Sequence, residues 1–110
     1  MVAPKIKMKA ILHKEFGGPE VLGVTNDVEI PQIEKHEVLI QVHAAGINRP
    51  DILQRSGGYP PPPGASEILG LEVSGEIVDV GEDVNKNLLN TKVCALVPGG
   101  GYAEFVKCHT

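Results

Sequence analysis

Short segments rich in apolar and β-branched residues recur along the chain, and they are typical of strands. The strongest spans residues 37–45 (EVLIQVHAA), which is nearly continuous in this character and therefore predicts a central strand. Gly- and Pro-rich stretches such as FGGPE, residues 16–20, separate the segments and predict turns. Weaker patterns of the same kind predict strands over residues 7–12, 21–30, 73–80, 91–96 and 102–107.

One segment, residues 49–55, predicts a short helix. Asn48 or Arg49 can act as its N-cap, and Pro50 suits the first turn, where a backbone N–H is not needed. Asp51 follows where the helix dipole favours negative charge. The tripeptide SGG then ends the helix, and YPPPP after it predicts a stiff loop. Many short strands, frequent turns and one short helix predict a mostly β fold, a small closed or half-closed β-barrel.

Composition fits a soluble globular protein and narrows the range of partners. Of the 110 residues, 42% are hydrophobic, and the formal net charge is −4, whereas nucleic-acid binders carry a basic excess. No apolar run approaches the roughly 20 residues that a membrane helix needs. The chain has only two cysteines, which favours a reducing compartment over a disulfide-stabilised fold. Its first segment lacks the apolar stretch of a signal peptide. We therefore expect a cytoplasmic protein that binds neither nucleic acid nor membrane.

The cysteines and histidines do not have the spacing of a zinc site. Structural zinc usually takes four Cys or His ligands in close pairs, and here only Cys108 and His109 are adjacent. The Gly-rich PGGG of residues 98–101 lacks the pattern of a phosphate-binding loop, so it predicts a hairpin turn. The potential ligands are Cys94, Cys108, His13, His36, His43 and His109.

By residue type alone, three polar side chains in the middle of the chain have structural roles. Asn48 and Asp51 would cap the helix, and Tyr59 would pack in the core. Their arrangement does not match an acid/base pair of carboxylates or a Ser/His/Asp triad. On these grounds the chain is a small β-barrel, and because it ends directly after a predicted strand, we expect it to be part of a longer protein.

Four stretches taken together resemble one family. They are FGGPEVL (16–22), AAGINRPDILQRSGGYPPPPG (44–64), ILGLEVSGEIVDVG (68–81) and PGGGYAEFV (98–106). In this order they resemble the N-terminal region of the medium-chain dehydrogenases/reductases, in the zinc-free quinone oxidoreductase branch that includes zeta-crystallin. The resemblance implies that residues 1–110 form the catalytic domain, a GroES-like, partly open β-barrel with one or two short helices. It also implies that a Rossmann domain, which binds NADPH in relatives, is absent from this chain.

The same resemblance implies that zinc is not used. Zinc-dependent relatives place a ligand Cys where this chain has Asn48, and a ligand His where it has Leu71. An amide and an alkyl side chain cannot replace a thiolate and an imidazole. The Cys-rich lobe that holds a second zinc in those relatives has no counterpart here. Alcohol oxidation needs a Lewis acid, so the resemblance favours hydride transfer to an electrophilic quinone instead.

The resemblance also implies roles for individual residues. Asn48 would line the nicotinamide and substrate cleft, and so serve both catalysis and NADP(H) binding. Asp51 would hold the helix start and order Asn48 or a water molecule. Tyr59 would form the cleft wall, with its hydroxyl as a donor to the quinone oxygen. Many bacterial members have Tyr at the position of Leu53, which leaves the substrate preference open.

Two other functions remain open. The first is an enone or enoyl-thioester reductase of the same superfamily, in which the same cleft receives an enone. The second is a GroES-like interaction module without enzymatic activity. For either enzyme the resemblance implies a small-molecule partner, a homodimer in the full-length form, and an inactive fragment when this domain is alone.

Overall fold

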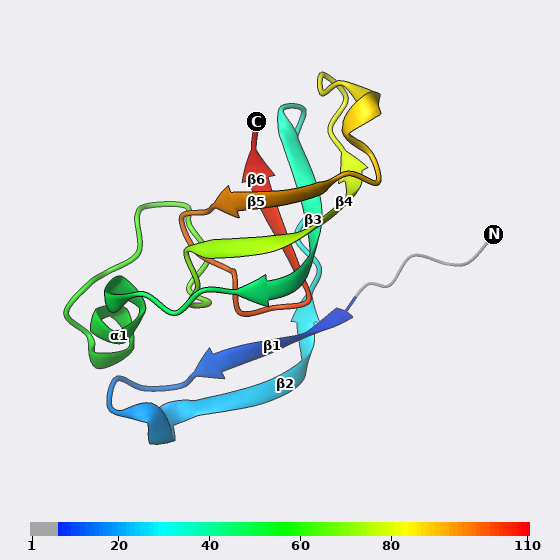
Figure 1. Ribbon diagram of the computed structural model, residues 1–110. Helices are drawn as coiled ribbons and strands as arrows, with labels where there is room; N and C mark the ends of the chain where they lie inside the picture. The colour runs from blue at the N-terminus through cyan, green and yellow to red at the C-terminus, as the bar shows by residue number, and fades with distance from the viewer. Residues whose placement is uncertain (1–6) are drawn as a thin grey trace.

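Two antiparallel β-sheets and one α-helix make up the computed structural model, which describes residues 7–110 (Figure 1). The sheets do not close into a complete barrel, so the predicted mostly β, partly open fold is confirmed. The strands are β1 (Lys7–His13), β2 (Leu22–Glu29), β3 (Glu37–Ala45), β4 (Glu72–Val80), β5 (Lys92–Leu96) and β6 (Phe105–His109); the helix is α1 (Arg49–Ser56), and single 3-10 turns occupy η1 (Pro19–Val21) and η2 (Lys86–Leu88).

The larger sheet has the strand order β5-β4-β3-β6. The prediction that residues 37–45 form a central strand is confirmed, because β3 pairs with β4 on one side and β6 on the other. The chain leaves this strand at Ala45 and enters α1 only four residues later. The start of the helix is therefore tied to a strand that is paired on both sides.

The hairpin of β1 and β2 is joined to the larger sheet by residues 102–104. Ala103 forms an isolated bridge with Ala10 on β1. On the other side, the Val42 N–H on β3 donates to the Glu104 carbonyl at 2.8 Å. This segment therefore links the two sheets through the backbone, without becoming a regular strand of either.

The predicted strand over residues 102–107 is wrong at its start, because β6 begins at Phe105. The backbone of Tyr102 is engaged elsewhere: its N–H donates to the Leu69 carbonyl at 2.9 Å, and its carbonyl accepts the Ile11 N–H at 2.9 Å. These partners come from a loop and from the other sheet. Periodicity in the sequence cannot reveal such a change of partner.

The main core lies on one face of the larger sheet. Ile40 on β3 is 1% exposed, and burial of one such side chain contributes about 1.5–3 kcal/mol. On β1, Met8 and Ala10 alternate with exposed neighbours, as expected for a strand with one covered face. The buried residues of the core cluster are Val38, Ile40, Val73, Ile77, Val84, Val97 and Val106.

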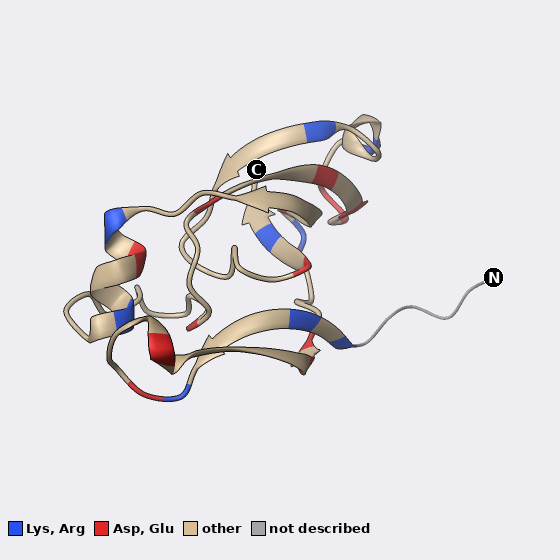
Figure 2. Ribbon diagram, turned by 60° about the horizontal axis from the view of Figure 1, so that its bottom comes forward, with Lys and Arg blue, Asp and Glu red and all other residues tan. Residues whose placement is uncertain are grey.

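The helix α1 has the ends that the sequence predicted. Asn48 is its N-cap in extended conformation, with φ −126° and ψ 160°. Gly57 ends the helix with φ 93°, in the left-handed region that an L side chain enters only with strain, and its N–H donates to the Gln54 carbonyl at 3.1 Å. Lys and Arg are interspersed with Asp and Glu over α1 and both sheets (Figure 2). Among the described residues, no helix has the length and apolar character to cross a membrane.

Candidate functional site

A buried carboxylate organises the start of α1. Asp51, which is 3% exposed, accepts three hydrogen bonds. The donors are the Asn48 N–H at 2.9 Å, the Gly70 N–H at 3.1 Å and the Tyr102 hydroxyl at 2.8 Å. Two of these donors lie far from Asp51 in the sequence. The carboxylate therefore joins the helix, the loop before β4 and the segment between the two sheets.

The approach of Gly70 to Asp51 requires a glycine. Gly70 has φ 107°, and a Cβ there would lie 2.7 Å from the Gly101 Cα and from the Tyr102 nitrogen. The two loops also bond directly, since the Gly101 N–H donates to the Gly70 carbonyl at 3.0 Å. This close backbone packing aims the Gly70 N–H at Asp51 and brings the Tyr102 side chain to the same carboxylate.

Asn48 lies at the edge of this cluster, half-buried. Its side-chain Nδ2 donates to Glu72 Oε1 at 3.3 Å, and the Gly46 N–H donates to the Glu72 carbonyl at 2.9 Å. Two apolar side chains lie close by: Ile47 is next in the chain and 79% exposed, and Leu96, paired with Glu72 in the sheet, is 80% exposed. An amide and a carboxylate thus sit at a surface edged by exposed apolar groups.

The phenol of Tyr102 is held in its neutral form. Burial raises its pKa most, and the hydrogen bond to Asp51 and the negative charge of that carboxylate raise it further. The hydroxyl also lies 3.4 Å from the Gly46 carbonyl. Tyr102 is therefore a hydrogen-bond donor that stays protonated well above the ordinary tyrosine range.

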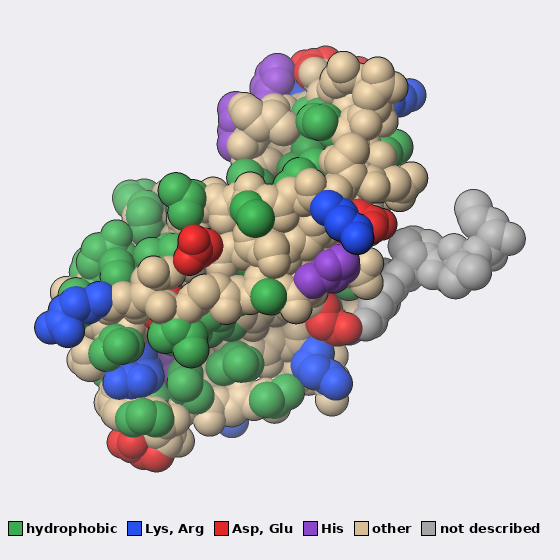
Figure 3. Space-filling model, viewed as in Figure 1, with side chains coloured by type: hydrophobic (Ala, Val, Ile, Leu, Met, Phe, Trp, Pro, Cys, Tyr) green, Lys and Arg blue, Asp and Glu red, His purple; other side chains and the backbone are tan. Residues whose placement is uncertain are grey.

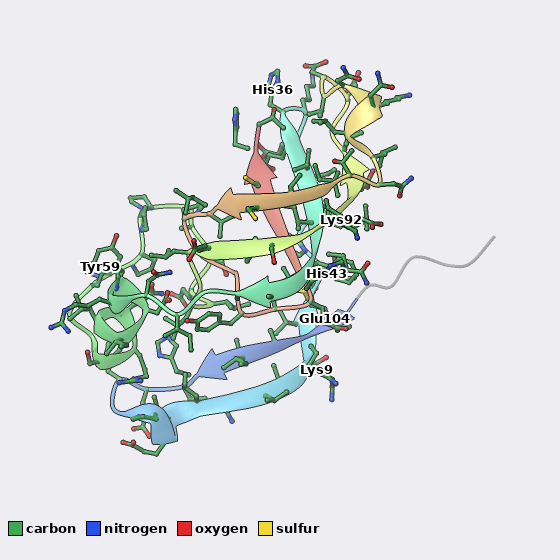
Figure 4. All side chains as sticks on the ribbon, in the orientation of Figure 1. Lys9, His36, His43, Tyr59, Lys92 and Glu104 are labelled. Atoms are coloured by element: carbon green, nitrogen blue, oxygen red, sulfur yellow. The ribbon has the colours of Figure 1, made fainter. Side chains whose placement is uncertain are left out.

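Tyr59 does not join the Asn48–Asp51 cluster. It lies beside α1 (Figure 4) and lines a pocket of about 580 Å³ together with Phe16 and Gln54, at the C-terminal half of the helix. Neither Asn48 nor Asp51 lines this pocket. With 38% of its surface exposed, Tyr59 is also not the core residue that its type alone predicted.

The histidines fall into separate places. His36 and His109 have ring centroids 6.0 Å apart, and His36 Nε2 lies 3.7 Å from Asp83 Oδ2 at the exposed end of the larger sheet. His43 is exposed on β3, in a row with Lys92, Glu104 and Lys9 on the side away from α1 (Figure 4). Within residues 7–110, no group of three or more His, Cys, Asp or Glu side chains is arranged to hold a metal ion.

The two cysteines are free thiols in different surroundings. Cys94 is exposed on β5. Cys108 on β6 is partly covered, and burial, with a smaller contribution from the charge of Glu37, raises the pKa of its thiol. Nothing in these contacts assigns either thiol to the cluster at the helix start.

Sequence reasoning placed Asn48 and Asp51 together but missed three of their partners. Helix or strand periodicity does not link these three partners, Glu72, Gly70 and Tyr102, to Asn48 and Asp51. They lie within the stretches ILGLEVSGEIVDVG and PGGGYAEFV. The sequence pointed to them only because these two stretches occur together with the helix segment. The bond from Asn48 to Glu72, and those from Gly70 and Tyr102 to Asp51, became visible only in the folded chain.

Comparisons with known proteins bear on this arrangement. The alcohol dehydrogenase GroES-like domain family matches residues 34–110. A quinone oxidoreductase of Mus musculus is 43% identical over 99 residues, which are 89% of this chain and 30% of the mouse protein. The chain thus spans less than a third of the length of that relative.

Two solved structures share the fold. A human synaptic vesicle membrane protein VAT-1 homolog-like protein superposes with a TM-score of 0.83 at 27% identity, over 96% of this chain and 33% of its own. A quinone oxidoreductase of Escherichia coli, solved in complex with NADPH, gives a TM-score of 0.74 at 31% identity, over 92% of this chain and 31% of its own.

Proposed function

Since the chain belongs to the alcohol dehydrogenase GroES-like domain family, we propose that it is the catalytic domain of an NADPH-dependent quinone oxidoreductase. In the full-length protein, a hydride passes from the nicotinamide to a quinone without zinc. Similarity to quinone oxidoreductases, one of them solved with NADPH, supports this reaction class. Because the chain spans less than a third of those relatives, the activity is proposed for the full-length protein, and we expect this chain alone to be inactive.

The observation that carries the proposal is the fixed position of Asn48. Asp51 holds its backbone N–H, and Glu72 accepts a hydrogen bond from its side-chain amide. Such an amide is already ordered before a ligand arrives, so binding costs little side-chain freedom. A side-chain amide can donate to a quinone oxygen, and it can both donate to and accept from a nicotinamide carboxamide, which suits the place where the two would meet.

When bound, the reduced nicotinamide supplies the hydride, and a quinone is electrophilic enough to accept it. The chain's own residues bind, orient and supply hydrogen bonds. Asn48 lines the cleft on the side of the cofactor and the substrate, and Asp51 keeps Asn48 in place. Tyr59 forms the wall of the cleft, and its hydroxyl would reach the quinone oxygen, where negative charge develops, only if the loop of residues 59–63 moves toward Asn48.

Zinc does not enter the proposal, because the donor groups at the helix start do not suit it. Zinc in proteins is bound by thiolates, imidazoles and carboxylates. Asn48 offers an amide, Leu71 offers no ligand atom, and the Asp51 carboxylate already accepts three hydrogen bonds. The Glu72 carboxylate beside Asn48 is a single ligand, and among the described residues it has no two further ligand side chains arranged with it. We therefore derive no step through a metal ion.

The test is NADPH oxidation by the full-length protein with an ortho-quinone, after treatment with a chelator. We expect turnover without added metal, and a loss of about tenfold or more in kcat/KM for Asn48→Ala, since a lost catalytic hydrogen bond costs on that order. The exposed Asn26 on β2 offers a matched control, and Asn26→Ala is expected to leave the rate unchanged. Tyr59→Phe tests the hydroxyl: a lower kcat with benzoquinone would place it at the reacting oxygen, and an unchanged kcat would leave Tyr59 as a wall residue only.

Each failure has a distinct meaning. No turnover with any quinone or enone would overturn the proposed function. Faster turnover of enones than of quinones would select the enone reductase instead. A ring of seven subunits in light scattering, together with inactivity, would favour the interaction module. An unchanged rate in Asn48→Ala would remove that residue from the site.

A further inference from the structure

The Glu72 side chain, at the start of β4, is held against the segment that joins β3 to α1. Its Oε1 accepts a hydrogen bond from Asn48 Nδ2 at 3.3 Å, and its backbone carbonyl accepts the Gly46 N–H at 2.9 Å. Gly46 leaves room for the carboxylate, since a Cβ at this position would overlap Glu72 Oε1. A carboxylate is therefore fixed beside the amide that the proposed function places at the nicotinamide.

Glu72 lacks the cation that accompanies other carboxylates of the chain. Asp27 Oδ1 lies 3.5 Å from Lys7 Nζ, and Glu37 Oε1 lies 3.6 Å from Lys107 Nζ. Among the residues that the structure describes, no Lys, Arg or His lies within ion-pair distance of the Glu72 carboxylate. Its side-chain partner is a neutral amide, so the negative charge is not offset by a neighbouring residue.

The surroundings of this charge are apolar. Ile47 is 79% exposed, and Leu96, opposite Glu72 on β5, is 80% exposed. Hydrophobic side chains also gather over α1 and the loop after it (Figure 3). When a ligand covers such a surface and excludes water, the effective dielectric constant falls and the charge acts more strongly. A flat ligand that carries a positive charge suits this combination.

The proposed reaction creates a positive charge of this kind. The C4–H bond of the reduced nicotinamide breaks, and its hydrogen leaves with both electrons to the quinone. The quinone is thereby reduced by two electrons and takes one proton from solvent to become the hydroquinone. The nicotinamide ring is neutral before the transfer and carries one positive charge after it.

We propose that the Glu72 carboxylate stabilises the oxidised, positively charged nicotinamide relative to the reduced, neutral one, an inference that rests on the proposed function. A ring in contact with Asn48 lies about two hydrogen-bond lengths from Glu72, roughly 6–7 Å. Coulomb attraction over this distance, at an effective dielectric constant of roughly 40–80, changes an equilibrium constant about three- to tenfold. The carboxylate thus favours the departure of the hydride.

The test is calorimetric titration of the full-length protein with NADP⁺ and, separately, with NADPH, in the absence of any quinone. Glu72→Gln removes the charge but keeps the size and an oxygen that accepts from Asn48. We expect it to weaken NADP⁺ binding about three- to tenfold and to change NADPH binding less than about twofold. A purely structural role of Glu72 would weaken both forms equally and leave the ratio of the two dissociation constants unchanged.

Matched variants locate the effect. Glu72→Asp keeps the charge, and its ratio is expected to stay close to that of the unaltered protein. Glu76→Gln removes the same charge from the same face of β4, about 13 Å away at the usual rise per residue. Because this distance exceeds the screening length of about 8–10 Å at physiological salt, its ratio is expected to be unchanged. An unchanged ratio in Glu72→Gln, or an equal shift in Glu76→Gln, would overturn the inference.

Turnover then separates this inference from the proposed function. Oxidation of NADPH by an ortho-quinone, with an unchanged ratio in Glu72→Gln, would sink the inference alone. A ratio that depends on Glu72, without NADPH oxidation by any quinone or enone, would sink the proposed function and leave Glu72 beside the nicotinamide. Absence of binding by both NADP⁺ and NADPH would overturn both.

Discussion

Asp51→Asn is the sharpest perturbation of the helix start, because it changes hydrogen bonding and charge with little change in shape. The carboxylate is acceptor-only and meets donors from Asn48, Gly70 and Tyr102. An asparagine has one oxygen and one NH₂ group. If its oxygen faces Asn48 and Tyr102, its NH₂ group points at the Gly70 N–H. In the other orientation, the NH₂ group faces the Asn48 N–H.

The cost follows from this conflict. A buried donor left without a partner costs about 1–3 kcal/mol, and each remaining bond loses about 1 kcal/mol when its acceptor is no longer charged. We therefore expect Asp51→Asn to lower the free energy of unfolding by about 3–5 kcal/mol. Total stabilities of domains are about 5–15 kcal/mol, so the variant should be near the limit of folding. Tyr102→Phe removes one donor and should cost about 1–2 kcal/mol.

Urea unfolding at neutral pH, followed by far-ultraviolet circular dichroism, measures these differences. Asp27→Asn is the matched control: the Asp27 side chain on β2 is 87% exposed, and its Oδ1 lies 3.5 Å from Lys7 Nζ. Surface pairs of this kind contribute about 0–1 kcal/mol, so the control should shift the midpoint little. If Asp51→Asn cost no more than Asp27→Asn, the three hydrogen bonds would not be what holds the helix start.

Three further outcomes are expected. In a Tyr59→Phe variant of this 110-residue chain, Tyr102 is the remaining tyrosine, and its phenolate absorbance should appear only well above the ordinary pKa of about 10. Because the folded pKa lies above the unfolded one, the stability from this group is intact below about pH 10 and falls as pH rises further, a loss that Tyr102→Phe should reduce. Gly57→Ala should cost about 1–2 kcal/mol in thermal unfolding, because its φ of 93° strains an L residue, and an unchanged melting temperature would contradict this. Iodoacetamide should alkylate the exposed Cys94 before Cys108, whose pKa is raised by burial, as peptide mass mapping would report.

Much of the local structure could be predicted from the sequence, because local physics determines it. Residues 37–45 form the central strand, since a nearly continuous β-branched run suits a strand paired on both sides. The helix begins after Asn48 and ends at Gly57, as its cap residues predicted. Residues only a few positions apart determine these features, so they can be predicted from the sequence.

Contacts between distant loops were beyond this kind of prediction. Tyr102 was assigned to a strand, yet its backbone bonds Leu69 and Ile11, and its hydroxyl bonds Asp51. The reason is the tight packing of Gly70 against Gly101, which leaves no room for a side chain. A glycine in the sequence indicates freedom, but it does not say which backbone comes close.

The position of Tyr59 decides which kinetic parameter, kcat or KM, its substitutions should change. A hydroxyl beside Asn48 would act on the reacting oxygen, so Tyr59→Phe would lower kcat with little effect on KM. A ring in the wall of the pocket that Tyr59 lines together with Phe16 and Gln54 would act on binding, so Tyr59→Ala would raise KM while Tyr59→Phe would leave it unchanged. The pocket lies at the end of α1 away from Asn48, which favours an effect on KM. A fall in kcat for benzoquinone in Tyr59→Phe would instead place the hydroxyl at the reacting carbonyl, and would mean that the loop of residues 59–63 moves toward Asn48 when substrate binds.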